Sequence, residues 1–235
     1  MSLVDLAGWF RNARKRYKIG REKPQLWFFE EAGFGYIQIP KVATRSIRQA
    51  FANTRELGYD GADFSAFEQR HSAHLSAHEI RARVGDAPVF AFVRHPLARL
   101  HSAWVNKIVD AERKGERNIL ACHGIHFGTS FEDFVDRVCD LPDRRIDRHL
   151  RAQVWFLHDE QGLIPTFVGK MECFPDDWQR LRETIPVLGE VGHANKAAFG
   201  ADYVSHYTPR MIDKVVQRYE ADFRLFGYEP ERAAA

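Results

Sequence analysis

Cysteine and long apolar runs are both scarce in this sequence of 235 residues. The three cysteines, Cys122, Cys139 and Cys173, are far apart and form no C-x-x-C pair, which argues against a zinc cluster or a redox motif. No run of about eighteen apolar residues occurs, and charged residues interrupt the first apolar positions, so neither a membrane span nor a secretory leader is expected. The sequence therefore predicts a soluble, cytoplasmic protein whose thiols are reduced.

A strong net charge and low-complexity sequence are also missing. The chain carries 34 Lys and Arg against 32 Asp and Glu, and its net charge of +2 is too small for a general nucleic-acid-binding role. Without repeats or linkers rich in Pro, Gly or Ser, we expect one domain over residues 1–235. We place a basic helix or extension at residues 1–25. Its cluster from Arg11 to Lys18 is either a solvated face, which we favour, or a contact with an anionic acceptor or membrane surface.

Short apolar runs alternate with helical patterns along the chain. Residues 35–39 and 89–93 are rich in aromatic and β-branched side chains, and each leads into a turn with proline and then a helical pattern. Residues 166–168 repeat this arrangement more weakly. Strands separated by helices predict an α/β fold, a single P-loop-like domain with a central, mostly parallel sheet flanked by helices.

Two helices have clear start signals, and two long stretches have no periodicity. One helix is expected to begin at Ser130, and another to run from Thr208 as N-cap to Gly227. Residues 53–72 and 107–129 are expected to be loops, and we place the second on the acceptor side.

The turn after the first predicted strand carries a lysine and two hydroxyls. Residues 36–47 read Y-I-Q-I-P-K-V-A-T-R-S-I, so Lys41, Thr44 and Ser46 stand where a strand gives way to a helix. Backbone N–H groups are unsatisfied at a helix start and the helix dipole is positive there, which suits an anion. The glycines of a Walker A loop, G-x-x-x-x-G-K-[ST], are missing. Taken alone, the turn has a second interpretation, in which a surface lysine lies beside a capping Thr or Ser.

A second strand-to-helix turn holds two arginines and a serine. Residues 90–104 read F-A-F-V-R-H-P-L-A-R-L-H-S-A-W, and Pro96 suits the first helical position, which leaves Arg94 at the carboxyl edge of the strand. Arg99 and Ser102 follow about one turn apart on the helix. Open α/β sheets bind ligands at this edge, and the planar donors of arginine match phosphate oxygens. Taken alone, these residues also fit a helix cap that pairs with surface acids.

Together the two turns resemble the paired phosphate sites of the sulfotransferase family that uses 3′-phosphoadenosine 5′-phosphosulfate (PAPS), in its carbohydrate, sulfotransferase family 2-like branch. P-K-V-A-T-R-S is similar to the 5′-phosphosulfate loop, although Arg45 replaces a small residue. The contacts that this similarity implies are Lys41, Val42, Ala43, Thr44, Arg45 and Ser46. V-R-H-P-L-A-R-L-H-S-A-W is similar to the 3′-phosphate site, although Trp104 replaces tyrosine, and it implies contacts by Arg94 and Ser102.

Three further stretches extend the resemblance over most of the chain. Residues 147–153 are similar to the D-x-H-x-x-x-Q segment of the carbohydrate sulfotransferases, 167–172 to their F-V-G-[KR]-x-E strand, and 219–228 to their C-terminal pattern. His149 and Gln153, four apart on a predicted helix, are expected to face the acceptor. We assign Asn195 and Lys196 either to a late loop over the nucleotide or to an ordinary exposed loop.

The resemblance implies a mechanism and a general base. Lys41 would neutralise charge on the leaving nucleotide. The segment H-L-S-A-H-E-I is similar to K-H-x-[ST]-A-x-E-[IL] of relatives, which points to His74 as the base, with Glu79, His71 and His78 as the other candidates. His78 is also expected to contact the acceptor. The spacing H-x-x-H-x-x-x-H would suit three metal-binding imidazoles on one helical face, but no carboxylate or Cys completes the site and we expect no metal.

The expected function is sulfuryl transfer from PAPS to a hydroxyl of a carbohydrate or glycoconjugate, with release of adenosine 3′,5′-bisphosphate. A P-loop-type kinase and a non-catalytic module that binds the nucleotide or an anionic glycan are the alternatives. A glycan, a glycolipid and a small-molecule hydroxyl all remain open as acceptors. The oligomeric state cannot be read from the sequence.

Overall fold

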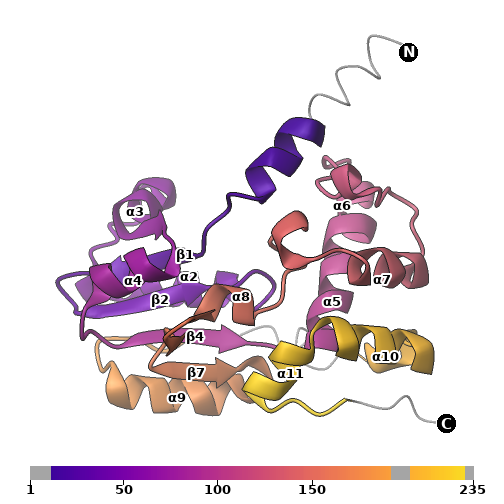
Figure 1. Cartoon of the computed structure of the whole chain (residues 1–235). Coiled ribbons are helices and arrows are strands. Elements are labelled where there is room, and N and C mark those ends of the chain that lie inside the picture. Colours follow the sequence, from indigo (N-terminus) through magenta and orange to yellow (C-terminus); the bar gives the residue numbers. More distant parts are fainter. Residues whose placement is uncertain (1–11, 192–201, 231–235) are drawn as a thin grey trace. The chain divides into compact units, whose positions relative to one another are not determined.

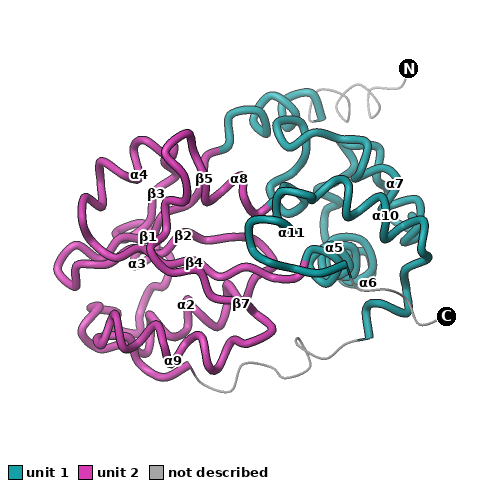
Figure 2. The backbone as a smooth tube through the Cα atoms, turned by 60° about the horizontal axis from the view of Figure 1, so that its bottom comes forward, with its two compact units in different colours: residues 1–22, 96–152, 202–235 teal, residues 23–95, 153–201 magenta. Residues whose placement is uncertain are grey.

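The computed structural model describes residues 12–191 and 202–230, which Figure 1 shows in colour. They form two compact units, each built from segments that are far apart in the sequence (Figure 2). Unit 1 contains the described parts of 1–22, 96–152 and 202–235, and unit 2 contains those of 23–95 and 153–201. That residues 1–235 act as one domain stays a prediction.

Unit 2 is built around a five-stranded sheet in the described part of the chain, with the order β3-β1-β2-β4-β7. Its strands are β1 (Gln25–Phe29), β2 (Phe34–Gln38), β3 (Ser72–His74), β4 (Val89–Val93) and β7 (Phe167–Lys170). β4 pairs in parallel with β2 and β7, whereas β1 runs antiparallel to its neighbours β2 and β3. All strands except β1 therefore point the same way, and the expected mostly parallel sheet is confirmed. β2, β4 and β7 are the three predicted strands.

Helices flank this sheet. In chain order they are α2 (Thr44–Asn53), α3 (Phe64–His71), α4 (Ala77–Val84), α8 (Val154–Leu157) and α9 (Phe174–Thr184). On one face, the ring centroids of Trp27 and Phe51 of α2 are 5.7 Å apart, and those of Phe92 and Trp178 of α9 are 6.1 Å apart. On the opposite face, a side chain at Gly35 would meet Val84 of α4. This layering confirms the predicted α/β fold.

Gly169 allows the closest packing in the sheet. A Cβ added to Gly169 would lie 2.4 Å from Cε1 of Phe92, which is too close for any real contact. We expect Gly169→Ala to destabilise the protein by about 1–3 kcal/mol, because the ring of a buried strand residue must move. Urea unfolding measures this, with Gly35→Ala as the milder control, since its Cβ would lie 3.3 Å from its nearest neighbours. Equal stability of Gly169→Ala and the wild type would contradict the close approach.

Unit 1 is helical in its described parts. It contains a helix over 12–19, α5 (Pro96–Trp104), a π-helical turn (Val105–Val109), α6 (Asp110–Arg113), α7 (Phe131–Cys139), α10 (Pro209–Arg218) and α11 (Glu220–Phe226). The predicted caps are confirmed: Ser130 accepts from the N–H of Asp133 and Thr208 from that of Met211. Of the helices in residues 12–191 and 202–230, none is long and apolar enough to cross a membrane.

One predicted helix and two predicted loops differ from the structure. The last helix begins after Thr208 and ends at Gly227 as predicted, but it is interrupted at Tyr219, where φ is −113° and ψ is 24° and where the buried ring donates its hydroxyl to the carbonyl of Leu150 at 2.7 Å. The predicted loop 53–72 contains α3, whose Asp63 N-cap lies outside any long apolar pattern. The predicted loop 107–129 contains the end of the π-helical turn and α6.

The basic N-terminal segment is helical over 12–19, as expected, and β1 begins at Gln25. Its charges are not all solvated. Lys15 Nζ lies 3.0 Å from Asp147 Oδ2, and Arg16 donates to the carbonyl of Cys122 at 2.7 Å. The favoured interpretation, a solvated face, is therefore wrong for Lys15, which is anchored within unit 1.

Candidate functional site

The predicted phosphate-binding turns follow neighbouring parallel strands of unit 2. Val93 of β4 pairs with Lys170 of β7, and continuing the β2–β4 register puts Pro40 across from Arg94. We call this end of the sheet the carboxyl edge, because β2, β4 and β7 all end there. Residues 39–43 form the Lys41 turn and residues 94–95 form the Arg94 turn. Open α/β sheets bind ligands at such an edge.

The backbone of the Lys41 turn is strained. Lys41 and Ala43 have φ angles of 71° and 38°, in the left-handed region. That region costs a residue with a Cβ about 1–2 kcal/mol. Strain of this kind persists where surrounding structure holds it, and it clusters at ligand sites. Turns with left-handed residues also aim backbone N–H groups into a concavity that binds anions.

The helix α2 begins directly after this turn. Its N-cap is Ala43, no side chain among the described residues caps it, and its first turn contains no acidic residue. Thr44 donates its hydroxyl to the carbonyl of Ile39 at 3.1 Å. The interpretation of this turn as a Thr or Ser cap is therefore wrong. The positive end of the α2 dipole is left without a negative side chain of its own.

Two side chains hold the backbone of the Arg94 turn. The Arg94 N–H donates to Gln153 Oε1 at 2.9 Å, and Gln153 Nε2 donates to the Arg94 carbonyl at 2.8 Å. The N–H of His95 donates to Glu172 Oε1 at 2.7 Å. Arg94 follows β4 directly, so it lies at the carboxyl edge as predicted.

Residues 149–153 do not form the predicted helix. They form a turn, and α8 begins only at Val154. His149 belongs to unit 1 and Gln153 to unit 2, so helical spacing does not bring them together. Acceptor contact by Gln153 stays a prediction, and its amide is paired with the Arg94 backbone. The late-loop residues Asn195 and Lys196 lie outside the described residues.

The remaining residues of the second motif lie on α5 of unit 1. Pro96 opens this helix, as predicted, and Ser102 is half-buried on it. Arg99 is only 3% exposed and donates to the carbonyl of Arg151 at 2.6 Å. Arg99 therefore packs inside unit 1, and the interpretation as a surface ion pair does not apply to it.

His74 ends β3 at the carboxyl edge. The sheet register aligns His74 with Gln25 of β1, and Gln25 with Gln38 at the end of β2. His74 Nδ1 lies 3.2 Å from the carbonyl oxygen of Lys23. Because a carbonyl only accepts, Nδ1 carries a hydrogen, and in the neutral ring Nε2 is then the accepting nitrogen. The neutral form of this exposed imidazole is thus the tautomer that a general base needs.

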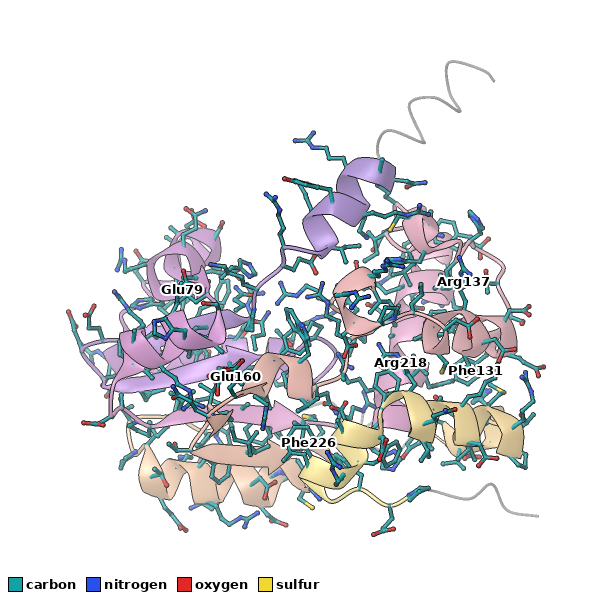
Figure 3. All side chains as sticks on the ribbon, viewed as in Figure 1. Glu79, Phe131, Arg137, Glu160, Arg218 and Phe226 are labelled. Carbon is teal, nitrogen blue, oxygen red and sulfur yellow. The ribbon has the colours of Figure 1, made fainter. Side chains whose placement is uncertain are left out.

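Glu79 is engaged in a helix cap. It lies in the first turn of α4 (Figure 3), where it accepts from the N–H and hydroxyl of Ser76 and forms an ion pair of 2.7 Å with Lys23. The hydrogen bonds from Lys23 and then Ser76 lower the pKa of Glu79 from 4.5 to about 2. A carboxylate that acidic is a weak base at neutral pH.

The ionised Glu79 should stabilise the protein in a pH-dependent way. Because its pKa is lower in the folded state, the contribution is present above about pH 4.5 and is lost as the pH falls towards about 2. We expect Glu79→Gln, which keeps the capping box, to have a slightly lower melting temperature at neutral pH. That difference should vanish in acid. Thermal unfolding across this pH range tests it, and a difference that persists in acid would contradict the ion pair.

The three histidines of the segment 71–78 lie on different elements. His71 ends α3, His74 ends β3 and His78 lies exposed on α4, so the alternative of three imidazoles on one helical face is wrong. The ring of His71 stacks on Phe29 at 4.8 Å, at the opposite end of β1 from the carboxyl edge, and burial lowers its pKa. In the described ranges, no three His, Cys, Asp or Glu side chains are grouped to hold a metal ion.

A chain of polar side chains lies beneath the carboxyl edge and was not predicted. Trp27 donates to Gln38 at 3.2 Å, Gln38 to Gln25 at 2.9 Å, and Gln25 to Glu68 at 3.0 Å. Arg48 of α2 pairs with the other oxygen of Glu68. The chain links the helix after the Lys41 turn to β1, β2 and α3. The glutamines at two strand ends, Gln25 and Gln38, were the only signal in the sequence.

In unit 1, a buried carboxylate orients His149. Asp147 Oδ1 lies 2.6 Å from His149 Nδ1, and the other oxygen lies next to Lys15. Although burial opposes it, the hydrogen bonds from His149 and the charge of Lys15 hold the pKa of Asp147 well below its usual range. An ionised carboxylate only accepts, so Nδ1 carries the hydrogen. Burial lowers the pKa of His149, which leaves a neutral ring with an accepting Nε2.

Comparisons with known proteins identify the family of this chain. No solved structure matches the chain. A family model described as the sulfotransferase family matches residues 24–229. That span covers most of the sequence and contains both predicted phosphate-binding turns, His74, Asp147 and Glu172. The chain therefore belongs to the sulfotransferase family.

Proposed function

We propose that this sulfotransferase takes its sulfuryl group from PAPS and transfers it to a hydroxyl of a carbohydrate or glycoconjugate. The supporting observation is the placement of the Lys41 turn and the Arg94 turn on adjacent parallel strands. One turn offers backbone N–H groups and a lysine, and the other offers an arginine at the same edge. Two anion-binding turns on neighbouring strands suit a nucleotide that carries phosphate at both its 5′ and 3′ positions.

The residues of the Lys41 turn and the start of α2 bind the 5′-phosphosulfate in this proposal. The N–H groups of residues 42–46 donate to it, and the ammonium of Lys41 faces the bridging oxygen, where charge develops. The guanidinium of Arg94 binds the 3′-phosphate, and contact by Ser102 stays a prediction. As the acceptor oxygen forms its bond to sulfur, its proton passes to Nε2 of His74. The bridging sulfur–oxygen bond breaks, and its electron pair stays on the 5′-phosphate of adenosine 3′,5′-bisphosphate.

The acceptor class rests on the similarity of residues 147–153 to the carbohydrate branch. His149 supports it, because a neutral imidazole held by a buried carboxylate can accept a hydrogen bond from a sugar hydroxyl. His78, exposed on α4, is the second proposed acceptor contact. We place this reaction in the cytoplasm, and cell fractionation checks that location.

Nucleotide-dependent thermal shifts test the donor. Adenosine 3′,5′-bisphosphate at about 100 times its Kd should stabilise the folded protein by about 2.7 kcal/mol, and Mg-ATP should have a much smaller effect. Stabilisation by Mg-ATP alone would favour a P-loop-type kinase.

Transfer of the sulfuryl group tests catalysis. Incubation with ³⁵S-labelled PAPS and a panel of glycans, glycolipids and phenols should label a glycan. Intact binding of the bisphosphate with no transfer to any acceptor would favour the non-catalytic module.

A further inference from the structure

Gln153 holds both backbone groups of Arg94. Its amide oxygen accepts from the Arg94 N–H at 2.9 Å and its amide nitrogen donates to the Arg94 carbonyl at 2.8 Å. This is the pair of bonds that a residue of an adjacent strand would make, yet β4 has already ended at Val93. Gln153 has no exposed surface. Because this buried amide forms hydrogen bonds with both the N–H and the carbonyl of Arg94, it is placed to fix the backbone of that residue.

Glu172 holds the next residue of the same turn. It follows β7 in a short 3₁₀ turn (Met171–Cys173), and its carboxylate accepts from the N–H of His95 at 2.7 Å. Hydrogen bonds to an ionised acceptor are shorter and about twice as strong as neutral ones. Gln153 and Glu172 come from different segments of unit 2 and hold two consecutive residues at the carboxyl edge.

Fixing this backbone decides where the Arg94 side chain can reach. The direction of the Cα–Cβ bond follows from the backbone atoms that Gln153 and Glu172 hold. A guanidinium matches a phosphate only when its planar donors meet two oxygens, so a small change in the direction of the side chain loses the match. Contacts to the 5′ end of a nucleotide, which belong to the Lys41 turn, do not depend on this direction.

We propose that Gln153 and Glu172 are positioning residues that aim Arg94 at the 3′-phosphate and so set the selectivity of the enzyme for PAPS over nucleotides that lack this phosphate. The inference rests on the proposed function. It also gives Gln153 a role different from the acceptor contact that the sequence predicts.

Calorimetric binding of two nucleotides tests the selectivity directly. The readout is the ratio of the Kd of adenosine 5′-monophosphate to that of adenosine 3′,5′-bisphosphate, measured at one salt concentration. Gln153→Leu and Glu172→Leu should each lower this ratio about tenfold. The Kd of the bisphosphate should rise, while the Kd of the monophosphate should change little. Glu172→Gln keeps an acceptor for the His95 N–H and should restore most of the ratio.

Matched controls lie on the exposed turn between β5 (His158–Asp159) and β6 (Gly162–Leu163), where Figure 3 labels Glu160. Gln161→Leu and Glu160→Leu should keep the wild-type ratio. If Gln153→Leu does not fold, the pair Glu172→Leu and Glu172→Gln decides the question, with thermal unfolding as the check of folding.

The outcomes separate this inference from the proposed function. If the wild type prefers the bisphosphate but the two Leu variants bind both nucleotides more weakly by the same factor, or keep the wild-type ratio, the positioning role is overturned. A wild type with no such preference would contradict the proposed function, and the inference would fall with it. A ratio that drops in the Leu variants and returns in Glu172→Gln supports the inference.

Discussion

Replacing Lys41 with alanine should slow sulfuryl transfer by about 10²-fold or more. The side chain belongs to the turn at the carboxyl edge, where the 5′-phosphosulfate is proposed to bind. Its ammonium would meet charge that develops only as the sulfur–oxygen bond breaks, so its loss should lower kcat more than it raises KM. Single-turnover transfer from labelled PAPS, at saturating concentrations of donor and acceptor, measures the effect.

The variant Lys41→Gly separates an effect on the chemical step from an effect on stability. Lys41 has a φ angle of 71°, which glycine adopts without strain. Lys41→Gly should therefore be as inactive as Lys41→Ala and at least as stable. Lys114, an exposed lysine of unit 1, provides the matched control, and Lys114→Ala should keep full activity. Turnover by Lys41→Ala close to that of the wild type would contradict the assignment.

Replacing His74 with glutamine should lower the rate of transfer by about 10²–10⁴-fold. Glutamine can still donate to the carbonyl of Lys23, but it cannot take the proton of the acceptor hydroxyl. Single-turnover transfer from labelled PAPS to one acceptor measures the loss, and a rate for His74→Gln close to that of the wild type would rule out this base.

Glu79→Gln is the control for the base. It keeps the cap of α4 and removes the carboxylate, so it should transfer sulfuryl at nearly the wild-type rate. A large loss in Glu79→Gln with an active His74→Gln would move the role of base to Glu79. The pKa of about 2 at Glu79 argues against that result.

The parts of the fold that were predictable are those with a local signal. β2 and β4 are five-residue strands that are buried along their whole length and apolar except for Gln38, and such runs are typical of strands inside a parallel sheet. β3 has the sequence S-A-H and, among the described strands, pairs with β1 alone, so it exists because of tertiary pairing and has no pattern of its own. The break at Tyr219 has no local signal either, and the partner of its hydroxyl, the carbonyl of Leu150, is 69 positions away.

The same distinction applies to the site. The positions of Lys41 and Arg94 followed from strand-to-helix turns with recognisable residues. The partner of Arg94 did not, because Gln153 is 59 positions away and its spacing from His149 suggested a helix that does not form. Lys15 likewise seemed to belong to a solvated face until the fold placed Asp147 beside it.

A crystal structure with adenosine 3′,5′-bisphosphate tests the account most directly. The 5′-phosphate should lie on the backbone N–H groups that follow Lys41, and the guanidinium of Arg94 should bind the 3′-phosphate. A nucleotide bound away from the carboxyl edge of unit 2, or one that touches a single turn, would contradict the account.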